Sequence, residues 1–237
     1  MNLKAGQGRW LFIDCDNTML GTEAMAIPSL VARFNQLYSQ NAGRELTVDE
    51  FQEHFHGQGR ETLCQNLAKH FNIAVTFEAL YDQREWRMMQ ALQASGVDMA
   101  PHLIEALTIL KETGFQFAFV SNNPIQRGLA AMRYSSNGQG NKLAQFFGTN
   151  FFEATDIQKP SPTVYLRALE QTGAQKETSF AVEDSATGVK AAVAAGLTTI
   201  AYLGFCPPQN RAKQSEKLLA LGAKYCIEDW LEVPKLV

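Results

Sequence analysis

The stretch that decides the fold reads Trp10-Leu11-Phe12-Ile13-Asp14-Cys15-Asp16-Asn17-Thr18. Its first four residues are apolar and predict a short buried strand. Alternate side chains of a strand share a face, so Asp14 and Asp16 are expected to start out pointing the same way. Two like charges side by side in a protein interior are costly unless a cation or a shared proton offsets their repulsion. The alternative is a solvated turn after the strand, where Asp and Asn are common.

The composition bounds the class of protein. A chain of 237 residues, 46% hydrophobic and 19% charged, can bury one large domain or a core domain with an inserted one. A net charge of −3 gives no reason to expect nucleic acid or an anionic membrane as partner. No apolar stretch approaches the ~18 residues of a membrane helix, and the polar N-terminus lacks the apolar segment of a signal peptide. Four scattered cysteines are typical of reduced thiols, so we expect a cytoplasmic protein.

The pattern along the chain changes twice. Residues 22–95 read as successive helices, with apolar residues at helical spacing and a helix start at Thr47. After Pro101, helices alternate with short apolar runs that predict strands at 115–120, 151–152, 180–182, 198–203 and 225–227. Such alternation predicts a parallel sheet covered by helices on both faces, an α/β fold of Rossmann-like type. The helical block is then an insertion after the first strand. We expect residues 80–92 to form one helix and 135–141 an exposed loop.

Polar residues occupy four separated positions at the ends of predicted strands or just before predicted helices. They are Asp14, Asp16, Ser121, Lys159, Glu183 and Asp184. In an open parallel sheet, ligands bind outside the carboxyl ends of the strands, so these side chains are expected to converge. Carboxylates with one ammonium and one hydroxyl group suit Mg2+ and a phosphate. Considered alone, Lys159 would be interpreted as a surface lysine before a proline turn, and Ser121 as a helix cap.

The chain resembles the haloacid dehalogenase superfamily, in the branch with a helical cap inserted after the first motif. Asp14-Cys15-Asp16-Asn17-Thr18 matches the DxDxT signature, with Asn17 in place of the commoner Gly. The other three motifs are matched by Val120-Ser121-Asn122-Asn123, by Lys159-Pro160-Ser161-Pro162, and by Val182-Glu183-Asp184-Ser185-Ala186-Thr187-Gly188. The resemblance covers nearly the whole chain. It implies a core domain of residues 1–20 and 97–237 and a helical cap domain of residues 21–96.

The resemblance also implies roles in catalysis. Asp14 would attack phosphorus and form an aspartyl-phosphate, and Asp16 would protonate the leaving oxygen and later activate water. A Mg2+ ion would be held by the carboxylates of Asp14 and Asp184 and the backbone carbonyl of Asp16. Glu183 would be either a further ligand or a residue that supports the ligands without binding the ion. The phosphate would be bound by Ser121, Asn122 and Lys159.

Two residues are candidates for contact with the rest of the substrate. Arg60 lies in a segment that resembles the cap of sugar-phosphate members, although a surface arginine paired with a neighbouring Glu is an equal alternative. Thr22 lies in a stretch that departs from the hinge sequence common in the family, yet could still reach the substrate. Spacing alone does not identify the substrate.

The function expected from these residues is Mg2+-dependent hydrolysis of a small phosphate monoester, such as a sugar phosphate. One alternative is a phosphosugar mutase of the β-phosphoglucomutase type, but mutases carry a His twelve residues after the nucleophile, where this chain has Ala26. Another is a non-catalytic relative that binds a metabolite. Asp16 argues against dehalogenation, which needs no general acid. The expected partner is a small phosphorylated metabolite, and the protein itself is expected to be a monomer or a homodimer.

Overall fold

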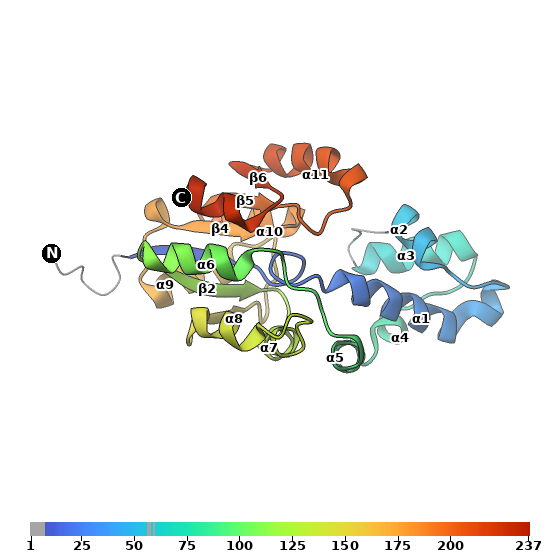
Figure 1. Cartoon of the computed structure of the whole chain (residues 1–237). Helices are drawn as coiled ribbons and strands as arrows, with labels where there is room; N and C mark the ends of the chain where they lie inside the picture. Colours follow the sequence, from blue (N-terminus) through green and yellow to red (C-terminus); the bar gives the residue numbers. More distant parts are fainter. Residues whose placement is uncertain (1–7, 56–57, 59) are drawn as a thin grey trace. The chain divides into compact units, whose positions relative to one another are not determined.

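The computed structural model of the protein describes residues 8–55, 58 and 60–237 (Figure 1), with the side chain of Arg60 outside the described part. Six parallel strands form one sheet in the order β3-β2-β1-β4-β5-β6. The strands are β1 (Arg9–Ile13), β2 (Phe115–Ser121), β3 (Phe151–Glu153), β4 (Phe180–Glu183), β5 (Thr198–Tyr202) and β6 (Tyr225–Ile227). The predicted α/β fold with a parallel sheet is confirmed.

The first strand lies in the middle of the sheet. Ile13 pairs with Phe119 of β2 on one side and with Val182 of β4 on the other. Leu11, Phe12 and Ile13 are fully buried, as a central strand between two helical layers requires. Because the three strands are in register, whatever follows each of them is delivered to the same edge of the sheet.

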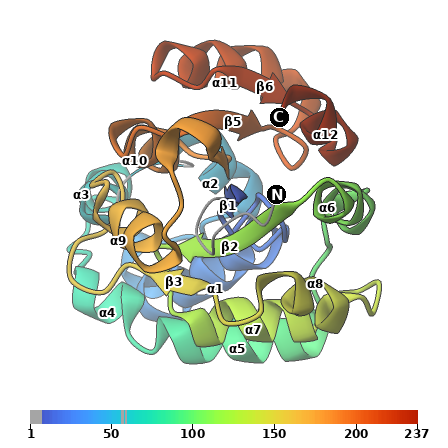
Figure 2. The same ribbon diagram turned by 90° about the vertical axis from the view of Figure 1, so that its left-hand side faces the viewer.

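Helices cover both faces of the sheet (Figure 2). On one face, α9 and α10 pack against Phe12, Val120 and Ala181, and α11 packs beside α10. On the other face lie α6, α7 and α8. The helices of this unit are α6 (Leu103–Glu112), α7 (Ile125–Arg133), α8 (Gly140–Phe147), α9 (Thr163–Thr172), α10 (Ala186–Ala194), α11 (Pro208–Ala220) and α12 (Val233–Leu236), with short 3-10 helices η1 (Lys176–Thr178) and η2 (Trp230–Glu232).

Contacts divide the chain into two compact units, one of Met1–Thr22 with Gly96–Val237 and one of Glu23–Ser95. The second, the helical unit, has its own core around Phe34, Leu67 and Leu80, all fully buried. Its helices are α1 (Glu23–Ala42), α2 (Val48–His54), α3 (Arg60–Phe71), α4 (Phe77–Tyr81) and α5 (Arg84–Ser95). As expected, Thr47 begins α2, and its hydroxyl oxygen accepts the N–H of Glu50.

Two expectations about local structure are wrong. Residues 80–92 do not form one helix, because Gln83 adopts a left-handed φ of 50° and separates α4 from α5. Residues 135–141 are not entirely an exposed loop, because α8 already begins at Gly140, which is buried. A Cβ atom at position 140 would lie 1.6 Å from the carbonyl oxygen of Met132, so only glycine allows the backbone this close.

Within the described ranges, no helix combines the length and the apolar composition needed to cross a membrane.

The helical unit should lose stability in acid through Glu50. Hydrogen bonds from Arg44 hold the pKa of Glu50 at about 2, against an ordinary value of 4.5, and His70 adds a contact of 2.8 Å. A depressed carboxyl pKa contributes stability that is complete above the unfolded-state value and is lost as the pH falls toward the folded-state value. Replacing Glu50→Gln should therefore lower the free energy of unfolding by about 1 kcal/mol near neutral pH, since Arg44 is half-exposed.

Urea unfolding of both proteins between neutral pH and about pH 3 checks this, and the difference should shrink over that interval. Glu53→Gln is the control, because the carboxylate of Glu53 is 75% exposed and lies 3.8 Å from His54. A difference between Glu50→Gln and the wild type that does not change with pH would contradict the assignment.

Candidate active site

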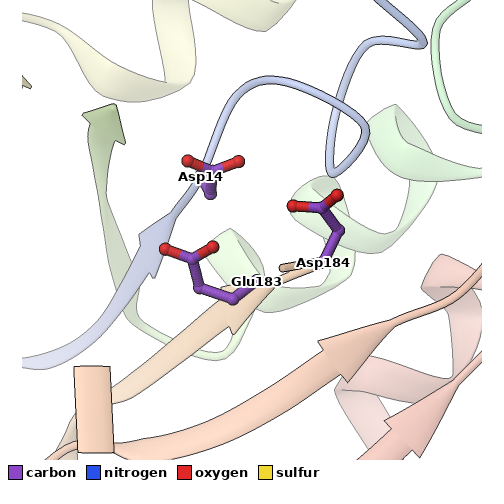
Figure 3. A group of neighbouring side chains, drawn as sticks. All are labelled: Asp14, Glu183 and Asp184. Carbon is purple, nitrogen blue, oxygen red and sulfur yellow. The ribbon is translucent and has the colours of Figure 1, made fainter. Parts of the chain in front are cut away.

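The carboxyl ends of three neighbouring strands bring the predicted site residues together. Asp14 directly follows β1, while Ser121 is the last residue of β2 and Glu183 the last of β4. Figure 3 shows the carboxylates of Asp14, Glu183 and Asp184 facing one another at this edge. Residues far apart in the sequence thus form one site because the parallel strands are in register.

The ammonium group of Lys159 lies at the centre of this arrangement. Its Nζ donates to Asp14 Oδ1 at 2.7 Å, to Glu183 Oε1 at 2.6 Å and to the carbonyl of Val120 at 3.0 Å. The side chain is 3% exposed, so it is not a surface lysine. Burial disfavours the charged form, but the two carboxylates outweigh it and raise the pKa of Lys159 above its ordinary value. Lys159 is therefore a fixed positive charge.

Asp14 is buried as well, which excludes the solvated-turn interpretation. Its Oδ2 accepts the hydroxyl of Thr18 at 3.2 Å, while Oδ1 accepts Lys159. Burial and the neighbouring charge of Glu183 raise the pKa of Asp14 to about 7, although Lys159 acts in the opposite direction. The positive charge of Lys159 therefore offsets only part of the cost of burying a negative charge on Asp14 beside Glu183.

The carboxylates fit a divalent cation. Asp14, Glu183 and Asp184 offer oxygen atoms that all lie within 4.8 Å of one another. Glu183 Oε2 is buried, and no donor among the described residues reaches it. Hard oxygen donors of this kind are the ligands that Mg2+ prefers. The side chain of Asp16 is not in this group, so its predicted part in metal binding rests on its backbone carbonyl alone.

Asp14 and Asp16 both lie beyond the first strand, which ends at Ile13, so strand alternation does not set the relative directions of their side chains. The carboxylate of Asp16 accepts three hydrogen bonds, from Thr22 Oγ1 at 2.5 Å, Asn123 Nδ2 at 2.6 Å and Arg127 Nη2 at 3.0 Å. Burial acts to raise the pKa of Asp16, but Arg127 and the hydrogen bonds outweigh it and lower the pKa.

The remaining predicted residues are placed as follows. Ser121 is buried, and its Oγ accepts the N–H of Asn123 at 3.0 Å. Asn122 binds the backbone of Lys159, since its Oδ1 accepts the Lys159 N–H at 2.8 Å. In the structure Asn122 therefore positions Lys159. Thr22 binds Asp16, and the side chain of Arg60 lies outside the described residues.

Sequence reasoning missed two buried residues of the site. Arg127 lies in the first turn of α7 and pairs with Asp16, and Tyr165 of α9 donates to Glu183 Oε1 at 2.5 Å. An aromatic residue at helical spacing is typical of a core, so nothing in the sequence separates Tyr165 from packing residues. Arg127 follows Gln126 at the start of a helix that also ends in an arginine, so its sequence context does not separate it from a surface residue.

The family model described as Haloacid dehalogenase-like hydrolase matches residues 11–202, and the chain belongs to that family. Protein CbbY of Cupriavidus necator is 26% identical over 133 residues, which are 56% of this chain and 52% of that protein. The chain thus matches about half the length of this curated relative.

Two solved structures show the same fold. A conserved haloacid dehalogenase-like protein of unknown function from Agrobacterium tumefaciens superposes with a TM-score of 0.78 at 21% identity, over 97% of each chain. A haloacid dehalogenase family hydrolase from Deinococcus radiodurans, with bound phosphate and sodium, superposes with a TM-score of 0.71 at 25% identity, over 97% of this chain and 94% of that one.

Gly188 lies directly against the carboxylate of Glu183, so a side chain at position 188 would show how tightly Glu183 is held. A Cβ atom at position 188 would lie 1.8 Å from Glu183 Oε2, and Glu183 cannot retreat because Lys159 and Tyr165 hold its other oxygen. Alanine ordinarily stabilises a helix relative to glycine by up to about 1 kcal/mol. Here we expect the reverse, with Gly188→Ala lowering the free energy of unfolding by about 1–3 kcal/mol.

Urea unfolding measures this change. Lys190→Ala is the matched control, since Lys190 is exposed on the same helix and its removal should change stability by less than about 0.5 kcal/mol. A Gly188→Ala protein as stable as the wild type would show that Glu183 is free to move.

Proposed function

We propose that this protein is a Mg2+-dependent phosphatase that hydrolyses a small phosphate monoester through an aspartyl-phosphate on Asp14. The observation that carries the proposal is the position of the Asp14 carboxylate, which contacts the ammonium of Lys159 and lies beside the carboxylates of Glu183 and Asp184. Membership of the haloacid dehalogenase-like hydrolase family supports it. The helical unit is proposed to act as the cap.

The proposed reaction has two steps that balance. First, an oxygen of Asp14 bonds to phosphorus while the ester P–O bond breaks, and the leaving oxygen takes a proton from Asp16. Second, a water molecule bonds to phosphorus and gives a proton to Asp16, while the bond between phosphorus and Asp14 breaks and phosphate leaves. The three donors around Asp16 in the structure match its proton-accepting form, which serves the second step.

Other residues of the core would bind the phosphoryl group. Lys159 supplies a positive charge next to the attacking carboxylate, and the hydroxyl of Ser121 lies at the neighbouring strand end. Asn122 holds the backbone of Lys159 and so fixes the place of that charge. Asp14, Asp184 and the backbone carbonyl of Asp16 would hold Mg2+, with Glu183 beside them. The chemistry supplied by bound Mg2+ is neutralisation of negative charge on the carboxylates and the phosphate.

Asp14→Asn should abolish Mg2+-dependent turnover of para-nitrophenyl phosphate, with kcat falling about thousandfold or more. The reason is that an amide cannot form the acyl phosphate, although it has nearly the same shape. Steady-state release of nitrophenol measures the effect, and mass spectrometry of acid-quenched wild-type protein should find phosphate on the peptide that contains Asp14.

The control is Glu177→Gln, which should keep full activity because this exposed carboxylate precedes the N-terminal end of β4, whereas the site lies at the other end of that strand. Thermal unfolding of both variants confirms that they are folded. Turnover by Asp14→Asn equal to that of the wild type would rule out Asp14 as the nucleophile.

Hydrolysis and mutase activity give different products. We expect a panel of phosphorylated metabolites, incubated with the wild type and Mg2+, to yield free phosphate from at least one sugar phosphate. Colorimetric phosphate determination and NMR of the sugar product separate the two activities. An isomeric sugar phosphate formed without free phosphate would support the mutase instead.

A further inference from the structure

Arg127 is a buried charge that the proposed reaction does not yet use. It lies in the first turn of α7, and its side chain is 6% exposed. Its Nη2 donates to Asp16 Oδ2 at 3.0 Å. A guanidinium group is costly to bury unless it is paired and hydrogen-bonded. The contact with Asp16 offsets part of this cost, and the question is what the buried pair does for the site.

The helix that carries Arg127 is held rigidly against the sheet. A Cβ atom at Gly128 would lie 2.5 Å from the ring of Phe119 in β2, so this turn of α7 packs directly on that ring. A functional group on a helix fixed in this way is held more precisely than one on a loop. The backbone of Arg127 is thus positioned by the packing of α7 on β2.

The two oxygens of Asp16 are bound by different kinds of donor. Oδ2 accepts N–H groups from Asn123 at 2.6 Å and from Arg127 at 3.0 Å, and such groups can only donate. Oδ1 faces the hydroxyl of Thr22 at 2.5 Å, which can donate or accept. Oδ2 is therefore an anchor, and Oδ1 is the oxygen whose partner tolerates a proton.

We propose that Arg127 is a positioning residue, which anchors Asp16 by Oδ2 so that Oδ1 exchanges the proton with the leaving oxygen and with water. The proposal rests on the phosphatase function proposed above. Arg127 acts through Asp16 and touches neither the phosphate nor the nucleophile. Its removal should thus impair proton transfer and spare the transfer of phosphorus to Asp14.

The leaving group separates these two effects. A dinitrophenolate leaves without a proton, whereas the alkoxide of an alkyl phosphate needs one. For Arg127→Met we expect kcat/KM to fall about hundredfold with glycerol phosphate and to stay within about threefold of the wild type with dinitrophenyl phosphate. Arg127→Lys, which keeps a donor, should recover part of the loss with glycerol phosphate. kcat/KM is used because it reports the steps up to formation of the acyl phosphate.

The matched control is Arg133→Met, an exposed arginine at the end of the same helix, which should behave as the wild type. Equal losses with both esters, or no loss with either, would overturn the proposal. If Arg127→Met does not fold, Arg127→Gln is compared with Arg127→Lys under the same criterion.

A crystal structure of the variant decides the point without activity. The carboxylate of Asp16 should leave its contact with Thr22, and a carboxylate at its wild-type position would overturn the positioning role. Should the wild type release phosphate from neither ester, the phosphatase function fails, while the crystal structure still decides whether Arg127 positions Asp16.

Discussion

The site depends on one buried ammonium group. Lys159 holds Asp14 and Glu183 at 2.7 and 2.6 Å, and without it two carboxylates would be packed side by side with no charge to offset their repulsion. Its third donor binds the carbonyl of Val120, which ties the ammonium to the end of β2. The ammonium is therefore held by groups at the ends of three neighbouring strands, β1, β2 and β4, so the sheet sets the geometry of the site.

A second cation performs the same task for Asp16. Lys159 binds Asp14 and Arg127 binds Asp16, and the two cations come from different parts of the fold, the connection between β3 and α9 and the first turn of α7. Two acidic residues separated by one position in the motif thus receive different environments. Burial and Glu183 raise the pKa of Asp14, whereas Arg127 and its neighbours lower that of Asp16. The two carboxylates of the motif therefore lie in different electrostatic environments.

The acidic cluster retains a deficit of positive charge. Lys159 is one cation facing Asp14 and Glu183, with Asp184 close by, and Glu183 Oε2 accepts no hydrogen bond from the described residues. The space beside that oxygen is bounded by Gly188, where any side chain would collide with it. A divalent cation would complete the charge balance, which is the physical reason for expecting Mg2+ at this edge of the sheet.

The sequence alone determined the parallel α/β sheet, the helical block of residues 22–95 and the strand ends that carry Asp14, Ser121 and Glu183, because apolar periodicity and chain order are local properties. It did not determine which side chains meet. The pairing of Arg127 with Asp16 and the contact of Tyr165 with Glu183 were decided by tertiary structure. The reason is physical: partners 111 and 18 residues apart are brought together by the packing of helices on the sheet, and no spacing in the sequence encodes that distance.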